Sequence, residues 1–352
     1  MRIENEIKLD FKDVLFKPKR STLNSRKEVS IYRSLSLPHS PRSWEGVPIV
    51  ASNMDTVATF EAGKVLTEMD MMVCLHKHYS EEEYISFYNW VYENQGCGYA
   101  QYWAYSMGIS DEEFDRLERI QDKTNGMIIT ICIDVANGYT ERFINFISKV
   151  RTKYPKCILI AGNVVTAEIT EQLILAGADI VKVGIGSGSA CTTRIQAGVG
   201  YPQLSAVMEC ADAAHGLGGR IISDGGCTCA GDVAKAFGGG ADFVMLGGML
   251  AGHTENLRLN EEGKAVFYGM SSSTAMDKYH GGVNEYRSSE GRTVEIERKG
   301  SIKDTLTNIL GGVRSTCTYI GAKELRELSK CTTFIRVTQQ YNPVFESKTL
   351  RR

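Results

Sequence analysis

Residues 157–183 have the sequence CILIAGNVVTAEITEQLILAGADIVKV, and this stretch decides the fold. It begins with an apolar run at 157–161, continues with a segment of helical period at 167–176, and ends with a second apolar run at 179–183. Short runs that are rich in β-branched residues are typical of strands. Because these runs are apolar at nearly every position, they indicate a parallel sheet that is buried on both faces. The stretch therefore predicts one strand–helix–strand unit.

The same unit recurs on both sides of this stretch. Helical period returns at 140–153, 201–215 and 230–237. The apolar runs, with the two above included, are 47–53, 71–75, 99–107, 127–133, 157–161, 179–183, 220–223 and 242–246. This repeated alternation of strand and helix predicts an α/β fold, a (β/α)8 TIM barrel, in a single domain of residues 1–352. A doubly wound sheet has the same order of elements, but polar residues gather just after the runs, where barrel enzymes build their sites.

The chain changes character after the last of these runs. Residues 249–300 form a polar, glycine-dotted and charged insertion, and an apolar pattern is clear only near Tyr268-Gly269-Met270. A long insertion at the catalytic face of a barrel is usually a lid, so we predict a mobile flap here. The alternative is a disordered surface loop. Residues 301–352 are expected to form a C-terminal helix and tail.

The bulk composition is that of an ordinary globular protein and narrows the choice of partners. The 352 residues are 43% hydrophobic and 23% charged, and the net charge is −2. A nearly neutral chain has no basic field for nucleic acid, and no segment approaches the roughly 18 apolar residues that span a membrane. The first 20 residues mix charges and lack the apolar core of a signal peptide. Ten cysteines are too sparse for a disulfide scaffold, so a cytoplasmic protein is expected.

Cys191 lies in a glycine-rich loop, VGIGSGSACTTR at 183–194, directly after an expected strand. Glycines at alternate positions let the backbone approach a ligand or an ion closely. A thiol followed by two hydroxyl residues has the parts of a covalent active site, which are a nucleophile and proton carriers. The alternative is a buried structural cysteine. The loop offers little apolar bulk for burial, so we predict a catalytic thiol.

Two glycine pairs follow the last two runs. They are Asp224-Gly225-Gly226 and Gly247-Gly248. Barrels commonly bind phosphate at this place, through backbone N–H groups and a helix N-terminus. Asp224 can accept two hydrogen bonds from a ribose diol, so the two pairs together indicate a nucleotide. The alternative is a pair of tight turns that only close the loops.

Two further segments contain candidate groups. His76-Lys77-His78 follows the second run, where a His-x-His pair can bind metal, although no carboxylate cluster completes a ligand set. Lys77 could instead orient an amide or an anion at the barrel mouth, unless it is a solvated surface lysine. Glu290 follows Ser288 and Ser289 in the insertion, where a carboxylate next to a hydroxyl could relay protons. The alternative for Glu290 is a solvated surface position.

These motifs, in this order, resemble the IMP dehydrogenase/GMP reductase family. The resemblance extends from LDFKDVL at 9–15 to FIRVTQQ at 334–340. Motifs that match the family between these ends are NMDTV at 53–57, HKHY at 76–79, DVANG at 134–138, AGNVVT at 161–166 and GMSS at 269–272.

The resemblance to the reductase branch of the family implies a reaction. GMP and NADPH would give IMP, ammonia and NADP⁺, a step of purine nucleotide interconversion. The Cys191 thiolate would attack purine C2 and displace the amine, and NADPH would reduce the resulting covalent thioimidate. Thr193 with Glu290 resembles the proton relay for the leaving amine, and Lys77 would lie near the nicotinamide.

The resemblance also implies ligand contacts and an assembly, which is a homotetramer. The GMP contacts would be Asp224, Gly225, Gly226, Gly247, Gly248, Gly269, Met270, Ser271, Arg287, Ser288, Ser289, Glu290 and Gly291. The cofactor contacts would be Ser25, Arg26, Lys77, Asp134, Val135, Ala136, Ile185, Gly186, Met270, Tyr286 and Arg287, with Ser315, Thr316, Cys317 and Thr318 reaching it across a subunit interface. The loop residues that would hold K⁺ are Gly186, Gly188, Cys191 and Arg194.

Two other functions stay open at this point. An IMP dehydrogenase would run in the oxidative direction with NAD⁺, and most such enzymes insert a regulatory domain where this chain has only residues 80–99. The segment GVGYPQ at 198–203 also follows the reductase style. A catalytically inactive nucleotide-binding protein would have lost a catalytic residue, but Cys191, Thr193 and Glu290 are all present.

The chain departs from the reductase pattern at three places. Ser187 replaces the usual proline, which should loosen the loop, and Ala190 replaces the usual valine. Residues 97–110 match the family poorly, which puts the expected strand at 99–107 in doubt.

Overall fold

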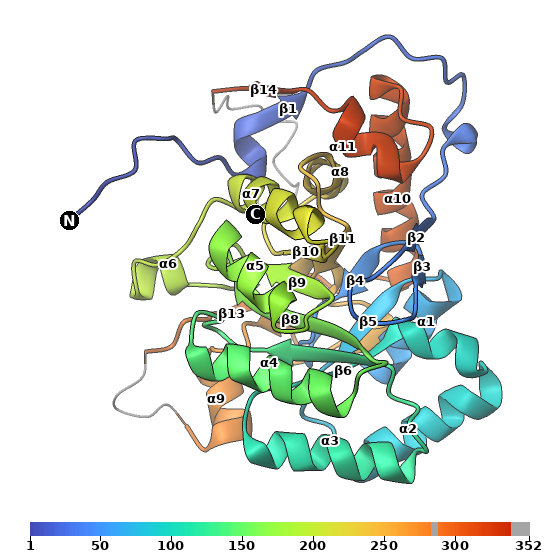
Figure 1. Ribbon diagram of the computed structural model, residues 1–352, viewed down its shortest axis with the longest axis vertical. Coiled ribbons are helices and arrows are strands. Elements are labelled where there is room, and N and C mark those ends of the chain that lie inside the picture. Colours follow the sequence, from blue (N-terminus) through green and yellow to red (C-terminus); the bar gives the residue numbers. More distant parts are fainter. Residues whose placement is uncertain (283–287, 339–352) are drawn as a thin grey trace.

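Eight parallel strands close into a barrel in the computed structural model, which describes residues 1–282 and 288–338 (Figure 1). The spatial order is β10-β11-β4-β5-β6-β7-β8-β9, and the pairing of Val244 in β11 with Ile49 in β4 closes the ring. The predicted barrel is therefore confirmed, because a doubly wound sheet would keep two open edges. The barrel strands are β4 (Ile49–Ala51), β5 (Met72–Leu75), β6 (Trp103–Met107), β7 (Thr130–Asp134), β8 (Ile158–Val164), β9 (Ile180–Val183), β10 (Arg220–Asp224) and β11 (Phe243–Leu246).

Helices connect the strands and cover the outside of the barrel (Figure 1). Helix α4 illustrates why they form, because the Thr140 hydroxyl caps its first turn and its apolar residues recur on one face. None of the helices in the described ranges is long and apolar enough to cross a bilayer. The helices of the barrel are α1 (Phe60–Glu68), α2 (Glu81–Asn94), α3 (Asp111–Lys123), α4 (Glu141–Lys153), α5 (Ala167–Leu175), α6 (Thr193–Gln196), α7 (Gln203–Gly216) and α8 (Ala230–Gly238).

The third barrel strand is shorter than the run that predicted it. Residues Cys97–Tyr102 form a 3₁₀ helix, η3, and β6 begins only at Trp103. Gly96 turns the chain into this helix with a φ of +81°. Tyr102 then packs against Trp44, with 6.1 Å between ring centroids. Tyr102 therefore belongs to the inner core beside Trp44, whereas Trp103 and Tyr105 of the same run do lie in β6.

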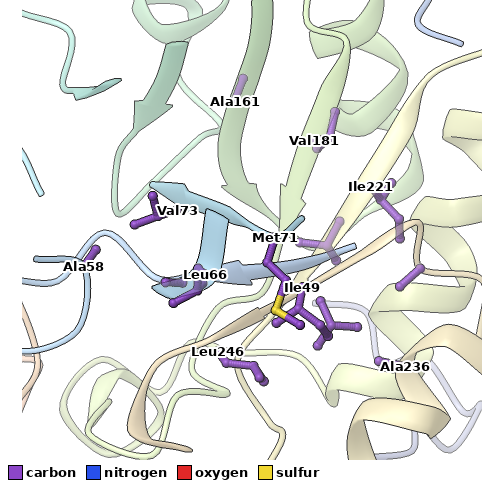
Figure 2. Close-up of a cluster of buried hydrophobic side chains, with 14 of the residues drawn as sticks. Ile49, Ala58, Leu66, Met71, Val73, Ala161, Val181, Ile221, Ala236 and Leu246 are labelled. Carbon is purple, nitrogen blue, oxygen red and sulfur yellow. The ribbon is translucent and has the colours of Figure 1, made fainter. Parts of the chain in front are cut away.

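The core has two layers, because successive strand residues point to opposite faces of the sheet. Val50 and Ile222 point into the barrel, whose base is covered by Trp44 at 4.7 Å from the Phe243 ring. The outer layer lies between the strands and the helices. Its residues include Ile49, Leu66, Val73, Val181, Ile221 and Leu246 (Figure 2).

The insertion of residues 249–300 contains regular structure. Strands β12 (Val266–Tyr268) and β13 (Thr293–Glu295) pair antiparallel, with Val266 opposite Glu295. Helix α9 (Ser273–His280) lies between them in sequence. The other elements are the 3₁₀ helices η1 (Phe11–Asp13), η2 (Arg26–Glu28), η4 (Gly248–Leu250), η5 (Thr254–Asn256) and η6 (Leu325–Glu327), the strands β1 (Val14–Phe16), β2 (Arg33–Leu35), β3 (Trp44–Gly46) and β14 (Phe334–Arg336), and the helices α10 (Ile302–Ile320) and α11 (Leu328–Cys331).

Candidate active site

A cavity of about 480 Å³ lies at the carboxyl ends of the barrel strands. Barrel enzymes bind their substrates at this face. Most of the residues predicted from the sequence meet here. Those that line the cavity are Lys77, Asp134, Val135, Ala136, Ile185, Gly186, Gly188, Cys191, Thr193, Asp224, Gly225, Gly226, Gly247, Gly248, Gly269, Met270, Ser271 and Glu290.

Cys191, Thr193 and Glu290 form one continuous chain of contacts. The Cys191 Sγ lies 3.2 Å from the Thr193 Oγ1, and that hydroxyl donates to the Glu290 Oε2 at 2.8 Å. Cys191 is partly exposed to the cavity and makes no disulfide. A thiol, a hydroxyl and a carboxylate in this order can move a proton between the nucleophile and a bound molecule. Glu290 is therefore not a merely solvated residue, although it comes from the insertion.

Backbone contacts hold Glu290 in this position. Its carbonyl oxygen accepts from the Thr192 N–H at 2.9 Å, and the Arg292 N–H donates to the Ala190 oxygen at 3.0 Å. Cys191 and Gly291 therefore face each other as an antiparallel bridge. The insertion is thus joined to the cysteine loop on both sides of Gly291, the residue after Glu290, which restrains the Glu290 carboxylate relative to the thiol.

The two glycine pairs lie beside the cysteine loop. Gly225 and Gly226 have positive φ values of +90° and +82°, which favour glycine. A Cβ on Gly225 would lie 2.5 Å from the Ser187 Oγ, and one on Gly248 would lie 2.6 Å from the Ser189 Oγ. The glycines therefore let the loops approach closely, rather than only closing turns. Their backbones and the Asp224 carboxylate face the same cavity.

Ser187, which stands where a proline is usual, makes two hydrogen bonds to the loop after β10. Its hydroxyl donates to the Asp224 oxygen at 3.0 Å, and its own carbonyl oxygen accepts from the Gly226 N–H at 2.9 Å. These two hydrogen bonds join the cysteine loop to the loop after β10. A serine can make the first of them, whereas the ring of proline has no donor.

Sequence reasoning missed Lys182, which lies at the floor of the cavity. Its Nζ is 2.6 Å from the Asp134 Oδ1 and 3.5 Å from the Asp224 Oδ2, and only 1% of the residue is exposed. Burial opposes the charge, but these two carboxylates raise the pKa of Lys182 well above its ordinary value. The sequence feature that could have identified Lys182 is a lysine inside an otherwise apolar strand, because a buried lysine needs charged partners.

The loop that contains Lys77 is supported by helix α3. Its ammonium group lies 3.1 Å from the Glu113 Oε1, and Arg116 donates to the carbonyl oxygens of Lys77 and Tyr79. Burial opposes the ionisation of Glu113, but Lys77 and the Gly108 N–H hold its pKa below the ordinary value. Lys77 is therefore a cation at the wall of the cavity, and its ion pair with Glu113 restrains it there.

His76 points into the protein and stacks on Tyr79, with 4.0 Å between ring centroids. His78 stacks on Tyr279 instead, so the two rings face different neighbours. No cluster of three or more His, Cys, Asp or Glu side chains with metal-binding geometry occurs in residues 1–282 and 288–338. The geometry of the described residues gives no support to the alternative of a histidine metal pair.

Replacing His76 with asparagine is expected to weaken the loss of stability in acid. Burial lowers the pKa of His76 from 6.5 to about 3, and only 4% of the residue is exposed. Below pH 6.5 this ring becomes protonated in the unfolded chain but stays neutral in the folded chain. The free energy of unfolding therefore decreases as the pH falls. Between pH 7.5 and 5.5 this ring should contribute about 1.4 kcal/mol to the loss. Urea unfolding of both proteins at the two pH values measures it, and equal losses would contradict the prediction.

Some predicted residues lie away from the cavity, and two cannot be placed. Ser25 and Arg26 lie at η2, which packs against α10, the helix that contains Ser315, Thr316, Cys317 and Thr318. The Cys317 side chain is buried in the core, and burial raises its pKa to about 12. Tyr286 and Arg287 fall outside the described residues.

The remaining predicted residues do not line the cavity. The Ser289 hydroxyl donates to the Gly291 oxygen at 3.0 Å and accepts from the Ser273 N–H at 3.1 Å. Ser288 donates to Gln196 at 3.2 Å. Arg194 donates to the Tyr201 oxygen at 2.7 Å, and its aliphatic part would meet a Cβ on Gly186 at 2.7 Å.

The fold and the site together define a barrel protein with a partly exposed cysteine at the wall of a cavity at the carboxyl ends of its strands. The family model described as "IMP dehydrogenase / GMP reductase domain" matches residues 8–348. GMP reductase of Tolumonas auensis is 57% identical over 349 residues, which are 98% of this chain and 99% of that protein. GMP reductase 2 of Homo sapiens is 58% identical over 347 residues, 97% of this chain and 98% of its own. The chain belongs to the IMP dehydrogenase/GMP reductase family.

Proposed function

We propose that this protein is an NADPH-dependent GMP reductase, which converts GMP into IMP and ammonia within purine nucleotide interconversion. The observation that carries the proposal is the chain from Cys191 through Thr193 to Glu290 at the wall of the cavity. The names and full-length similarity of the relatives support the same reaction.

The chemistry starts at the Cys191 sulfur. Attack of the thiolate on purine C2 forms a C–S bond, and departure of the 2-amino group breaks the C2–N bond to leave a thioimidate. The amine must leave as ammonia, so it needs a proton. Thr193 contacts both the thiol and Glu290, which places its hydroxyl to pass that proton. NADPH supplies the hydride that reduces C2 and allows the C–S bond to break.

The GMP phosphate and ribose fit the glycine side of the cavity. Asp224 would accept hydrogen bonds from the ribose hydroxyls, while the N–H groups of Gly225 and Gly248 would face the phosphate, and Gly226 would support them through its bond to Ser187. The base would then lie towards Cys191, where Met270 and Ser271 complete the wall. Ser288, Ser289 and Gly291 would support these contacts from behind, and Arg287 would join them.

The cofactor would occupy the other side of the same cavity. Asp134, Val135 and Ala136 line it together with Ile185 and Lys77, so both charges at this edge are in place to meet a nicotinamide and its ribose. The group formed by Ser25, Arg26 and residues 315–318 lies outside this cavity within one chain. In a homotetramer, a neighbouring subunit would bring that group to the cofactor. Light scattering of the purified protein measures its molar mass and so tests whether it is a tetramer.

Potassium would bind the cysteine loop. Such a cation is bound by hard oxygen ligands. Here they would be the carbonyl oxygens of Gly186, Gly188 and Cys191, close to Arg194. The loop is compact at this point, because Gly186 has a φ of +77° and leaves no room for a side chain against Arg194. A bound cation would then fix the backbone on either side of the nucleophile. Replacing K⁺ by tetramethylammonium in the assay tests this.

The deciding experiment mixes the purified protein with GMP and NADPH and follows the reduced-cofactor absorbance, with ammonia measured in parallel. We expect equal amounts of NADPH lost and ammonia released. Formation of NADH from IMP and NAD⁺ instead would assign the dehydrogenase direction. Binding of GMP without turnover in either direction would assign a nucleotide-binding protein. Reduced cysteines suit a cytoplasmic location, which is part of the proposal.

A further inference from the structure

Asp55 is a buried carboxylate that the proposed chemistry does not use. It follows β4 in the motif Asn53–Val57, and only 1% of the residue is exposed. Burying a carboxylate costs free energy unless charged or polar partners compensate for the lost water. The partners of Asp55 therefore indicate what this charge holds in place.

Three donors from the insertion converge on one oxygen of Asp55. The hydroxyls of Tyr268 and Tyr279 both lie 2.5 Å from its Oδ2, and the Lys278 Nζ lies 2.8 Å away. Burial opposes ionisation, but these three donors hold the pKa of Asp55 below its ordinary value. Short hydrogen bonds to an ionised group are stronger than neutral ones. The carboxylate is thus held in its charged form, and its Oδ2 is bonded to the insertion, while its Oδ1 is buried and has no hydrogen-bond partner among the described residues.

The donors come from two places that bracket a catalytic segment. Tyr268 ends β12, whereas Lys278 and Tyr279 lie in the last turn of α9. His78, which follows β5, stacks on the Tyr279 ring with 3.5 Å between centroids and 10° between planes. Residues that follow the barrel strands β4 and β5 therefore hold both ends of residues 268–279.

The bracketed segment is joined to the residues that directly follow Glu290. The Gly269 N–H donates to the Arg292 oxygen at 3.2 Å, and Ser272 forms a bridge with Gly291. A Cβ on Gly291 would lie only 2.9 Å from the Ser272 nitrogen, so the two backbones are in close contact. A shift of α9 would consequently be transmitted to Glu290.

We propose that Asp55 is a positioning residue that anchors the insertion on the barrel and thereby sets the place of Glu290 relative to Thr193 and Cys191. The expected effect on kcat rests on the proposed reductase function. The anchoring of the insertion by Asp55 does not depend on that function. Asp55 touches none of the reacting groups, so its effect passes through the segment that it holds.

The test replaces Asp55 with asparagine in the full chain. The side chain keeps its size but loses its charge, and its new N–H groups compete with the three donors. We expect hydrogen exchange of residues 268–280 to become at least roughly tenfold faster, while exchange in the barrel strands stays unchanged. The kcat for GMP should fall about 100-fold, since a misplacement near 1 Å has that effect on chemistry.

Asp242→Asn is the matched control. Asp242 is also buried, at 2% exposure, but it lies at the amino end of β11 and binds His215 and the Ile221 N–H. This variant should lower the thermal midpoint without changing kcat or the exchange of α9. If both variants give the same pattern, or if Asp55→Asn keeps normal kcat and normal α9 exchange, the proposal is overturned.

Tyr279→Phe is a second variant that tests the same proposal if Asp55→Asn does not fold. It removes one donor and leaves Lys278 and Tyr268 on the carboxylate, so exchange of α9 and kcat should change several-fold in the same directions. An unchanged Tyr279→Phe would count against the anchor. Failure of the native protein to turn over GMP would overturn the proposed function alone, because the exchange measurement is made without ligand.

Discussion

Replacing Cys191 with alanine is expected to abolish turnover of GMP while leaving GMP binding largely intact. The sulfur is the only protein atom in the proposed mechanism that becomes bonded to the purine, so no neighbouring side chain is expected to substitute for it. Removing a nucleophile of this kind lowers kcat by about 10⁴-fold or more. The nucleotide should still bind, because the Asp224 carboxylate and the glycine loops are separate from the thiol. Cofactor absorbance gives the rate and calorimetry gives the affinity for GMP.

The matched control for this variant is Cys331→Ser. Cys331 is also a partly exposed thiol, but it lies in α11 and does not line the cavity. Its replacement should leave both turnover and GMP binding near the native values. Near-normal turnover by Cys191→Ala would show that no covalent thioimidate forms on this residue. A loss of GMP binding equal to the loss of rate would assign the thiol to binding rather than to catalysis.

The barrel could be predicted because its signal is local and repeated. The run at 179–183 and the helical period at 140–153 correspond closely to β9 and α4. The strand expected at 99–107 was four residues too long at its start, since aromatic residues suit both a strand and a buried cap. The insertion has a weaker local pattern, and its strands β12 and β13 gain their pairing from each other.

The meeting of the candidate catalytic residues could be predicted from loop chemistry, whereas the residues that support them could not. Cys191, Thr193 and Glu290 meet as expected, because polar residues after strands collect at one face of a barrel. Lys182 and Asp55 depend on partners that are distant in sequence. The hydroxyls that bind Asp55 come 213 and 224 residues later, so only the closed barrel brings them together.

Replacing Glu290 with glutamine is expected to slow the chemical step by about 10²- to 10³-fold with little effect on GMP affinity. Glutamine can still contact the Thr193 hydroxyl, which now lies 2.8 Å from the Glu290 Oε2. It cannot take up or return a proton, however, so the leaving amine would lose its relay. The backbone bonds from Thr192 and Arg292 should keep the loop in place, because neither involves the side chain. Single-turnover measurements with saturating GMP and NADPH isolate this step from product release.

Glu295→Gln is the control, since it changes a carboxylate in the same insertion. Glu295 is exposed and pairs with Lys264, so its loss should leave the rate unchanged. A third variant, Thr193→Val, removes the hydroxyl between the thiol and the carboxylate. If proton transfer needs both side chains, Thr193→Val and the double variant Thr193→Val/Glu290→Gln should be about equally slow. The first substitution already blocks the transfer, so the second has no further effect on the rate. Additive effects would mean that the two side chains act separately, and Glu290 would then bind the cofactor or substrate instead of relaying a proton.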